Sequence, residues 1–243
     1  GACMQEFPIS IEHVPAIIGM RRSQVMMEAD FPAELQAMFE NLENNFSPWA
    51  FSPEDRAAWA AESDVKLCRD SDDFDILFWV GCAGSYDDNA KRTSRAMVEI
   101  MNHAGVKFAI LGDEEKCNGD LARRSGNEYL ADMLIKMNVD TMKGYGVKKI
   151  VTACPHCYNT FKNEYPDFGF AVEVVHHTQF INDLIQQGKI KINEQTKLNL
   201  TYHDSCYLSR YNSEVSAPRE VLSQVNHNSI NEVARSKDRS FCC

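Results

Sequence analysis

The chain has 243 residues, of which 44% are hydrophobic and 25% charged, as in ordinary globular proteins and unlike disordered ones. Its formal net charge of −10 argues against a nucleic-acid partner, because phosphate binding needs a basic surface, but it suits docking to a basic protein. No apolar run approaches the roughly 20 residues of a membrane span, and the first four residues lack the basic start of a signal peptide.

The first part of the chain is predicted to be helical. Residues 8–63 have an amphipathic pattern that Pro15, Pro32 and Pro53 interrupt. Residues 52–55 read Ser-Pro-Glu-Asp, which is typical of a capped helix start with proline at its first position. A short charged stretch follows at residues 69–73, so we expect residues 1–70 to form a helical region of their own.

From residue 74 onward, strand and helix patterns alternate. Strands are predicted at residues 74–80, 106–111, 147–153, 172–176 and 198–203, and helices at 89–103, 122–142 and 178–187. Such alternation gives an α/β fold with a mostly parallel sheet covered by helices. Ligands gather beyond the carboxyl ends of parallel strands. Cys82, Cys154 and Cys206 each follow a predicted strand, so we expect them to bind a ligand at the carboxyl edge of the sheet.

The cysteines also indicate an internal repeat. Cys206 follows Cys82 by 124 residues, and Cys242 follows Cys117 by 125. This spacing suggests a duplicated α/β unit, the first at residues 71–195 and the second starting at residue 196. The second unit stops at residue 243 without its own C-x-x-C, and the chain begins with Gly rather than Met. We therefore expect the natural protein to extend beyond both ends.

The arrangement of the nine cysteines favours metal ligation over disulfides. Adjacent cysteines such as Cys242 and Cys243 seldom pair with each other, and no export signal is present. Iron–sulfur clusters usually take four thiolates, and the first unit supplies four at Cys82, Cys117, Cys154 and Cys157. The same four would also suit a tetrahedral zinc ion.

Other interpretations remain open for individual residues. The C-x-x-C at residues 154–157, with Pro-His between its cysteines, also suits a thiol–disulfide oxidoreductase. Cys68 stands alone in a polar stretch and is expected to be an ordinary buried residue. The pair His176-His177 could line a site or cap the following helix. Asp204, close to Cys206, is typical of a group that orients a ligand.

Near the N-terminus, the chain has a partial ferredoxin pattern. In the run C-x-x-C-x-x-C-x-x-x-C-P, Cys3 matches the third cysteine and Pro8 the proline. Phe7 stands where the fourth cysteine belongs.

Five motifs together resemble a known family. The segments FWVGCAGS (78–85), KCNGDLARR (116–124) and TACPHC (152–157) are similar to the cysteine-rich (CCG) domains of heterodisulfide reductase catalytic subunits. YHDSCYL (202–208) and SFCC (240–243) look like a second such domain. Similar domains occur in iron–sulfur subunits of glycolate and lactate oxidases and in membrane-linked oxidoreductases that accept electrons from electron-transfer flavoprotein.

The resemblance implies which residues hold clusters. The family pattern is a Cys, a Cys-Cys-Gly and a C-x-x-C, which hold a 4Fe–4S cluster that is noncubane in some members. In the first unit these positions are Cys82, Cys117, Cys154 and Cys157, and Asn118 replaces the second adjacent cysteine. A conventional cluster or zinc is therefore expected there. The second unit keeps Cys206, Cys242 and Cys243, so a noncubane cluster is expected there rather than in the first unit. Cys3 would belong to the end of a preceding ferredoxin-like domain.

The resemblance also implies a function. It predicts an iron–sulfur oxidoreductase component whose electrons come from a flavoprotein or flavin dehydrogenase subunit. The expected acceptor is a quinone in a membrane-bound partner, with a disulfide as the alternative. Such a protein would be cytoplasmic, or peripheral to or tethered at the inner face of the cell membrane. A zinc-stabilised binding module and a thiol–disulfide oxidoreductase are the rival functions.

Overall fold

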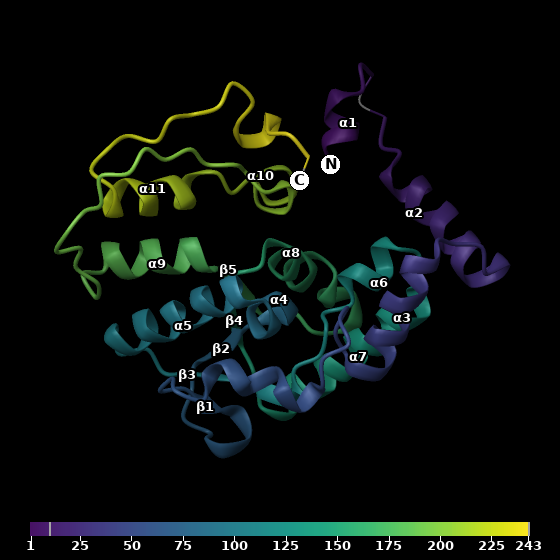
Figure 1. Cartoon of the computed structure of the whole chain (residues 1–243), viewed down its shortest axis with the longest axis horizontal. Helices are drawn as coiled ribbons and strands as arrows, with labels where there is room; N and C mark the ends of the chain where they lie inside the picture. Colours follow the sequence, from purple (N-terminus) through teal and green to yellow (C-terminus); the bar gives the residue numbers. More distant parts are fainter. Residues whose placement is uncertain (10, 243) are drawn as a thin grey trace.

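The computed structural model describes residues 1–9 and 11–242, which form an α/β fold around one five-stranded sheet (Figure 1). All strands of this sheet are parallel, in the order β1-β3-β2-β4-β5. Their bounds are Lys66–Leu67 (β1), Ile76–Trp79 (β2), Phe108–Ile110 (β3), Lys149–Thr152 (β4) and Glu173–His176 (β5). The predicted fold class is thus confirmed.

Helices cover both faces of the sheet. Those of the first unit are α4 (Gly81–Tyr86), α5 (Asp88–His103), α6 (Asp120–Arg124), α7 (Glu128–Gly144), α8 (Pro155–Asn163) and α9 (His177–Gln186), with 3-10 turns η3 (Cys68–Asp70), η4 (Gly112–Glu114) and η5 (Tyr165–Phe168). The later part of the chain adds α10 (Cys206–Asn212), α11 (Ser216–Val225) and η6 (Lys237–Arg239). Among the described residues, no helix combines the length and the apolar character needed to cross a bilayer.

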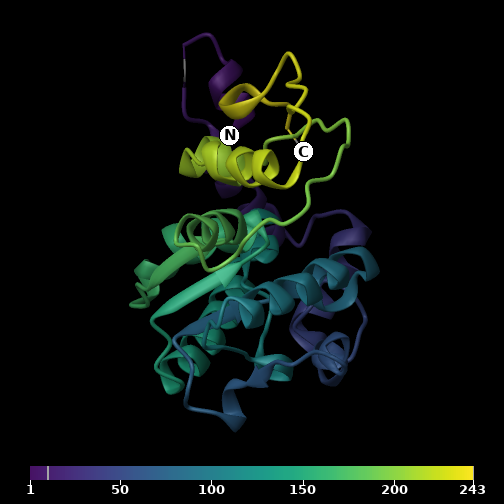
Figure 2. The same ribbon diagram turned by 90° about the vertical axis from the view of Figure 1, so that its left-hand side faces the viewer.

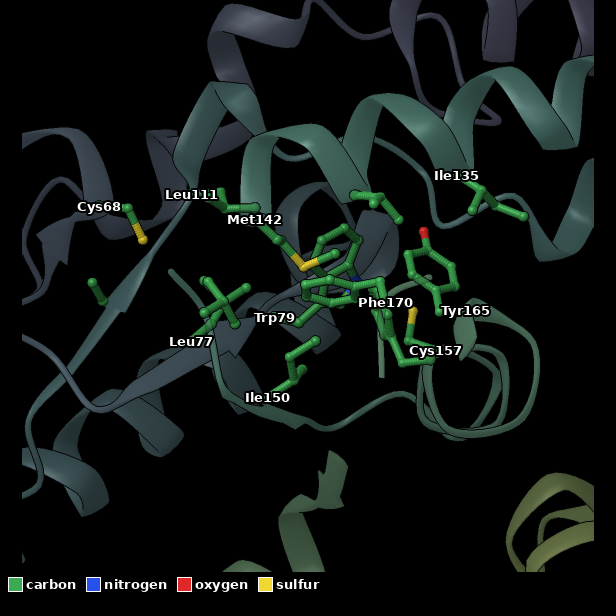
Figure 3. Packing of buried hydrophobic residues seen from close by; sticks show 14 residues of the cluster. Cys68, Leu77, Trp79, Leu111, Ile135, Met142, Ile150, Cys157, Tyr165 and Phe170 are labelled. Atoms are coloured by element: carbon green, nitrogen blue, oxygen red, sulfur yellow. The ribbon is translucent and has the colours of Figure 1, made fainter. Parts of the chain in front are cut away.

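Side chains on β2 alternate between two hydrophobic cores, one on each face of the sheet. Leu77 and Trp79 point to the core that α7 and α8 cover, shown close up in Figure 3. Ile76 and Phe78 point to the opposite core, which α5 and α9 cover. This strand is buried on both faces, as expected of a central strand in a parallel sheet. It therefore fixes the position of the chain that follows it.

The N-terminal region is helical, as predicted, and packs against the first unit. It contains α1 (Ala2–Glu6), α2 (Val14–Ser23), a π-helical turn η1 (Gln24–Glu28), α3 (Ala33–Asn45) and the 3-10 helix η2 (Pro53–Ala60). The Ser52 hydroxyl accepts a hydrogen bond from the Glu54 amide, which confirms the predicted cap. The buried face of α3, with Phe39 and Leu42, packs on leucines of α7.

The predicted strand at residues 198–203 is wrong. This segment is extended but joins no strand of the sheet; the Asn231 amide donates to the Leu200 carbonyl, and one isolated bridge joins Thr196 to Asn226. A parallel strand needs a neighbouring strand to satisfy its backbone groups, and the second unit provides none among its described residues. Figure 2 shows the last part of the chain, coloured from yellow-green to yellow, as a separate layer above the sheet.

Two further differences concern the first unit. Residues 66–67 form an edge strand within the region predicted to be purely helical, because a two-residue strand is too short to give a sequence pattern. The predicted helix over 122–142 is two helices, α6 and α7. Gly126 separates them at φ +97, where a Cβ atom would lie 2.4 Å from the Arg21 carbonyl oxygen. Close packing of α2 on this turn therefore requires glycine.

The two ends of the described chain lie together (Figure 1). The amino group of Gly1 donates to the Tyr211 hydroxyl at 2.6 Å. Gln5 of α1 donates to Asp238 of η6, and Arg235 donates to Glu6. Helix α1, which carries Cys3, is thus part of the same layer as α10, which begins at Cys206.

Candidate metal centre

Cys82 lies in the first turn of α4, directly after β2. The buried carboxylate of Glu115 holds this turn, because it accepts from the amides of Val80 (3.0 Å) and Gly81 (2.9 Å) and from Nη2 of Arg56 (2.9 Å). The same Nη2 lies 3.4 Å from Sγ of Cys82. The guanidinium of Arg56 is therefore a buried positive charge in contact with the first cysteine of the unit.

Cys117 lies in the loop between η4 and α6, on a backbone that Asn138 of α7 fixes. The Asn138 amide group donates to the carbonyls of Lys116 (3.3 Å) and Cys117 (3.0 Å) and accepts from the Lys116 amide (3.1 Å). The Cys117 amide donates to the carbonyl of Phe46 at 2.8 Å, which ties the loop to the segment after α3.

Cys154 and Cys157 stand at the N-terminus of α8, directly after β4. Cys154 is the N-cap, Pro155 is the first helical residue and Cys157 lies in the first turn. Three residues of separation place both side chains on one side of the helix start. The predicted position of the C-x-x-C at a helix N-terminus is confirmed.

All four cysteines of the first unit line one cavity of about 280 Å³ at the carboxyl ends of β2 and β4. The rest of the lining comes from the segment after α3, from η2 and from the starts of α4, α6 and α8: Pro48, Trp49, Arg56, Trp79, Gly81, Ala83, Asn118, Asp120, Leu121 and His156. Within the described residues, no three or more His, Cys, Asp or Glu side chains already stand in the geometry of a single metal ion.

The thiols form two hydrogen-bonded pairs with unequal acidity. A hydrogen bond from Cys117, with help from Arg56, lowers the pKa of Cys82 to about 6. A hydrogen bond from Cys157, together with backbone amides at the start of α8, lowers the pKa of Cys154 to about 7. The pKa values of Cys117 and Cys157 are raised because each thiol donates to its partner and is buried. Each pair thus offers one thiolate near neutral pH, the form that binds metals.

The cavity walls also carry hydrogen-bond donors without an acceptor. Among the described residues, five buried side-chain nitrogen or oxygen atoms have no hydrogen-bond partner. Three of the five belong to residues that line this cavity: Nε of Arg56, Nε1 of Trp79 and Nδ2 of Asn118. All three are N–H donors. Cysteines, residues with unpaired buried N–H groups and one guanidinium therefore line the same space, which fits an anionic group with sulfur acceptors.

The cysteines predicted for other sites lie elsewhere. Cys206 is the first residue of α10, and Nη1 of Arg210 lies 2.9 Å from its sulfur. Cys3 and Cys242 are both exposed. Tyr211 interacts electrostatically with Cys3 and with Cys206, so these two cysteines share a neighbourhood. Cys243 lies outside the described residues.

Residues whose roles the sequence left open have structural positions. Cys68 is buried at one edge of the hydrophobic core, well apart from Cys157 (Figure 3), and burial raises the pKa of Cys68 to about 12. His176 caps α9 and contacts Thr178 (2.8 Å), so the capping interpretation holds for it. The carboxylate of Asp204 accepts two hydrogen bonds from Arg219, at 2.7 and 2.8 Å, and one from the Lys237 amide.

Sequence reasoning missed Arg56, Glu115 and the orphaned N–H of Trp79. Arg56 lies 26 residues before Cys82 on an amphipathic helix, where an arginine normally faces solvent. Glu115 is one of several acidic residues before Cys117, and its neighbour Glu114 is not fully buried. No local pattern distinguishes these residues, because their burial depends on contacts between distant segments.

Comparison with known proteins gives the family. Residues 76–162 and 200–243 each match the cysteine-rich domain family abbreviated CCG, which confirms the resemblance and the duplication. The chain is 44% identical over 247 residues to an EtfAB:quinone oxidoreductase of Syntrophomonas wolfei subsp. wolfei, covering all of this chain and 34% of that protein.

Two further relatives have related names. A probable iron–sulfur-binding oxidoreductase FadF of Bacillus subtilis is 39% identical over 99% of this chain and 35% of its own length. One subunit of the dihydromethanophenazine:CoB–CoM heterodisulfide reductase of Methanosarcina barkeri is 34% identical over 91% of this chain and 54% of its own length. The chain thus spans about a third of the first two relatives and about half of the third. No solved structure matches it. The two matched segments cover more than half of the chain, which therefore belongs to the cysteine-rich (CCG) domain family.

Proposed function

We propose that the first unit holds an iron–sulfur cluster on Cys82, Cys117, Cys154 and Cys157 and that the chain is an electron-transferring part of an oxidoreductase. The observation that carries this proposal is the convergence of four thiols from three separate loops on one cavity. When bound, such a cluster would accept and release one electron at a time. The chain's own residues position the four sulfur atoms and place the Arg56 guanidinium 3.4 Å from one of them, Sγ of Cys82.

The size of the cavity supports a cluster rather than zinc. Four thiolates on one zinc ion, with Zn–S distances of about 2.3 Å, would surround the ion closely and leave no room for anything else. The thiols of this chain instead border a space of about 280 Å³. A group that brings several iron and sulfide atoms suits such a space better than a single ion does.

The direction of electron flow is proposed from the relatives. An EtfAB:quinone oxidoreductase is 44% identical to this chain, and the heterodisulfide reductase polypeptide is 34% identical. We therefore assign a flavoprotein as electron donor and a quinone, held by a membrane-bound partner, as acceptor; a disulfide is the alternative acceptor. The net charge of −10 suits docking to a basic partner surface. With a membrane quinone as acceptor, the protein would act in the cytoplasm at the inner face of the membrane, as a peripheral or tethered protein.

The second unit is proposed as a separate cluster site. Its cysteines are Cys206, Cys242 and Cys243, with a C-x-x-C still to be supplied. Since the first unit has Asn118 in place of a fifth thiolate, a noncubane cluster belongs more naturally in the second. Cys3 would serve a ferredoxin-type cluster on residues 1–70, next to Cys206. With residues 71–195 as the first unit and 196–243 as the start of the second, the cysteine groups would form a relay.

Spectroscopy and metal analysis test the cluster. The purified anaerobic protein should absorb at about 400 nm, and dithionite should bleach the band. Replacing Cys82 by serine should remove iron and sulfide from the first unit. Cys68→Ser is the matched control, because Cys68 is also buried but lies outside the cavity, and it should keep the metal. A colourless protein with stoichiometric zinc would refute the proposal.

A thiol–disulfide oxidoreductase is the second candidate, favoured by one observation. Cys154 has a pKa lowered to about 7, whereas that of Cys157 is raised, and this asymmetry suits a nucleophilic cysteine with a resolving partner. This function predicts disulfide reductase activity that survives removal of iron and zinc. It also predicts that Cys82→Ser keeps that activity and Cys154→Ser loses it, whereas the cluster proposal predicts no activity in the metal-free protein.

A further inference from the structure

The three orphaned N–H groups come from different parts of the chain and meet at one cavity. Arg56 lies on η2, Trp79 ends β2, and Asn118 follows Cys117 in the loop before α6. These three residues are 2%, 0% and 5% exposed, so they are shielded from bulk solvent. A buried donor without an acceptor is costly. Three of them around four thiols indicate that the fold is arranged for a partner that accepts hydrogen bonds.

The rest of each side chain is firmly held, so the donors cannot turn away. The Trp79 ring packs edge-on against Phe161, with 4.5 Å between the ring centroids. Oδ1 of Asn118 accepts from the Asp120 amide at 3.1 Å and lies 3.9 Å from Sγ of Cys117, so its NH₂ group is the part of the amide that has no partner. Arg56 is anchored by Glu115 and by the Phe46 carbonyl through its other nitrogens. The donors are therefore oriented before any group binds.

We propose that Arg56, Trp79 and Asn118 form a wall of hydrogen-bond donors that sets the reduction potential of the first-unit cluster. The inference rests on the proposed function, since it requires a cluster on the four thiols. Uptake of one electron from the reduced flavin of the donor protein makes the cluster and its thiolates more negative. N–H donors and a guanidinium stabilise the reduced form more than the oxidised form and so raise the potential.

The second unit supports the same principle. Nη1 of Arg210 lies 2.9 Å from Sγ of Cys206, as Nη2 of Arg56 lies 3.4 Å from Sγ of Cys82. The two arginines come from unrelated positions, one before its unit and one within α10. In both units a guanidinium nevertheless contacts the first cysteine. Asn118 adds another hydrogen-bond donor in the first unit, at the position where the family pattern has a cysteine thiolate.

Potentiometric titration of the reconstituted full chain tests the wall. A background with both Cys3→Ser and Cys206→Ser restricts the signal to the first unit. Trp79→Phe keeps an aromatic ring and removes the N–H. We expect it to lower the ratio of reduced to oxidised protein at fixed ambient potential on the order of tenfold, which is about 59 mV for a one-electron couple. Asn118→Asp keeps the oxygen that Asp120 needs and replaces the donor by an acceptor, so its shift should have the same sign and be larger.

Matched controls separate tuning from damage. Trp59→Phe makes the same change at a buried tryptophan that does not line the cavity, and it should leave the potential unchanged. Iron and sulfide contents should equal those of the parent. With ¹⁵N-labelled tryptophan, pulsed electron paramagnetic resonance of the reduced Trp49→Phe protein should show a nitrogen coupling that Trp79→Phe abolishes and Trp59→Phe retains; Trp49 is replaced because it also lines the cavity.

The outcomes distinguish the two proposals. A parent protein that binds only zinc overturns the proposed function. A parent with a reducible cluster, in which Trp79→Phe changes the ratio less than twofold or raises the potential, overturns the donor wall alone. The absence of the indole nitrogen coupling would do the same.

Discussion

Replacing Glu115 by glutamine tests the buried ion pair that positions Cys82. The Glu115 and Arg56 side chains are 2% and 1% exposed, and one carboxylate oxygen serves both Arg56 and the Gly81 amide while the other serves the Val80 amide. Glutamine must turn an NH₂ group toward one of these donors. The change therefore leaves one buried N–H without an acceptor and leaves the buried guanidinium with only the Cys82 sulfur as a negative partner.

The expected cost follows from that geometry. Breaking a buried pair by removing one partner costs about 3–5 kcal/mol. For a chain of this length each kcal/mol corresponds to roughly 2–4 °C in the melting temperature, so we expect a fall of roughly 6–20 °C. Urea and thermal unfolding of the reduced, metal-free protein, followed by circular dichroism, measure it.

A surface ion pair provides the control. Arg69 and Asp113 pair at 2.5 Å, but their side chains are 44% and 37% exposed. Asp113→Asn makes the same carboxylate-to-amide change and should hardly move the unfolding midpoint, because exposed pairs contribute little. If Glu115→Gln destabilises the protein no more than Asp113→Asn does, the assignment of Glu115 as the anchor of the α4 turn is wrong.

Three further predictions concern pH, packing and metal. Burial lowers the pKa of His176 to about 3, so unfolding takes up a proton between pH of about 6.5 and 3. The stabilising contribution of neutral His176 is fully present above this window and is lost as the pH falls through it. His176→Asn should lower the slope of the unfolding free energy against pH by about 1.4 kcal/mol per pH unit in this window. An unchanged slope would contradict the assignment. Gly126→Ala should destabilise the protein by about 1–3 kcal/mol in urea unfolding, because φ is +97 and the Arg21 carbonyl blocks a Cβ atom. Gly144→Ala is the control and should not destabilise it, because the space around Gly144 is open. Equal effects of the two substitutions would exclude the steric cause. Cys157→Ser should lose first-unit iron while Cys3→Ser retains it; iron analysis showing the reverse would move the cluster site elsewhere.

The sheet and the four thiols could be predicted because each depends on local sequence. A buried strand such as β2 is a run of apolar residues, and a cysteine that follows it lies at the carboxyl edge whatever the rest of the chain does. The two-residue strand β1 is too short to have a period. Residues 198–203 have the sequence pattern of a strand, but a strand also needs a second strand to pair with. The periodicity of a segment does not show whether such a pairing strand is present.

The surroundings of the thiols could not be predicted for a related reason. The contact of Arg56 with Cys82 joins residues 26 positions apart, and that of Glu115 with Val80 joins residues 35 apart. Nothing in the sequence around Arg56 marks it as buried, since its charge is typical of a solvent-facing helix position. The four cysteines of the cavity could be identified in the sequence, and the charged groups that surround them could not.

Helix η2 contributes Arg56 to a cavity whose thiols all lie within residues 76–162, the span that matches the family. The recognisable repeat and the functional compartment therefore have different boundaries. Expressing residues 71–195 by themselves would produce every cavity cysteine of the first unit without the guanidinium at Cys82, and without Trp49 on the cavity wall. Such a fragment would test how much of the proposed metal binding depends on the repeat and how much on the segment that precedes it.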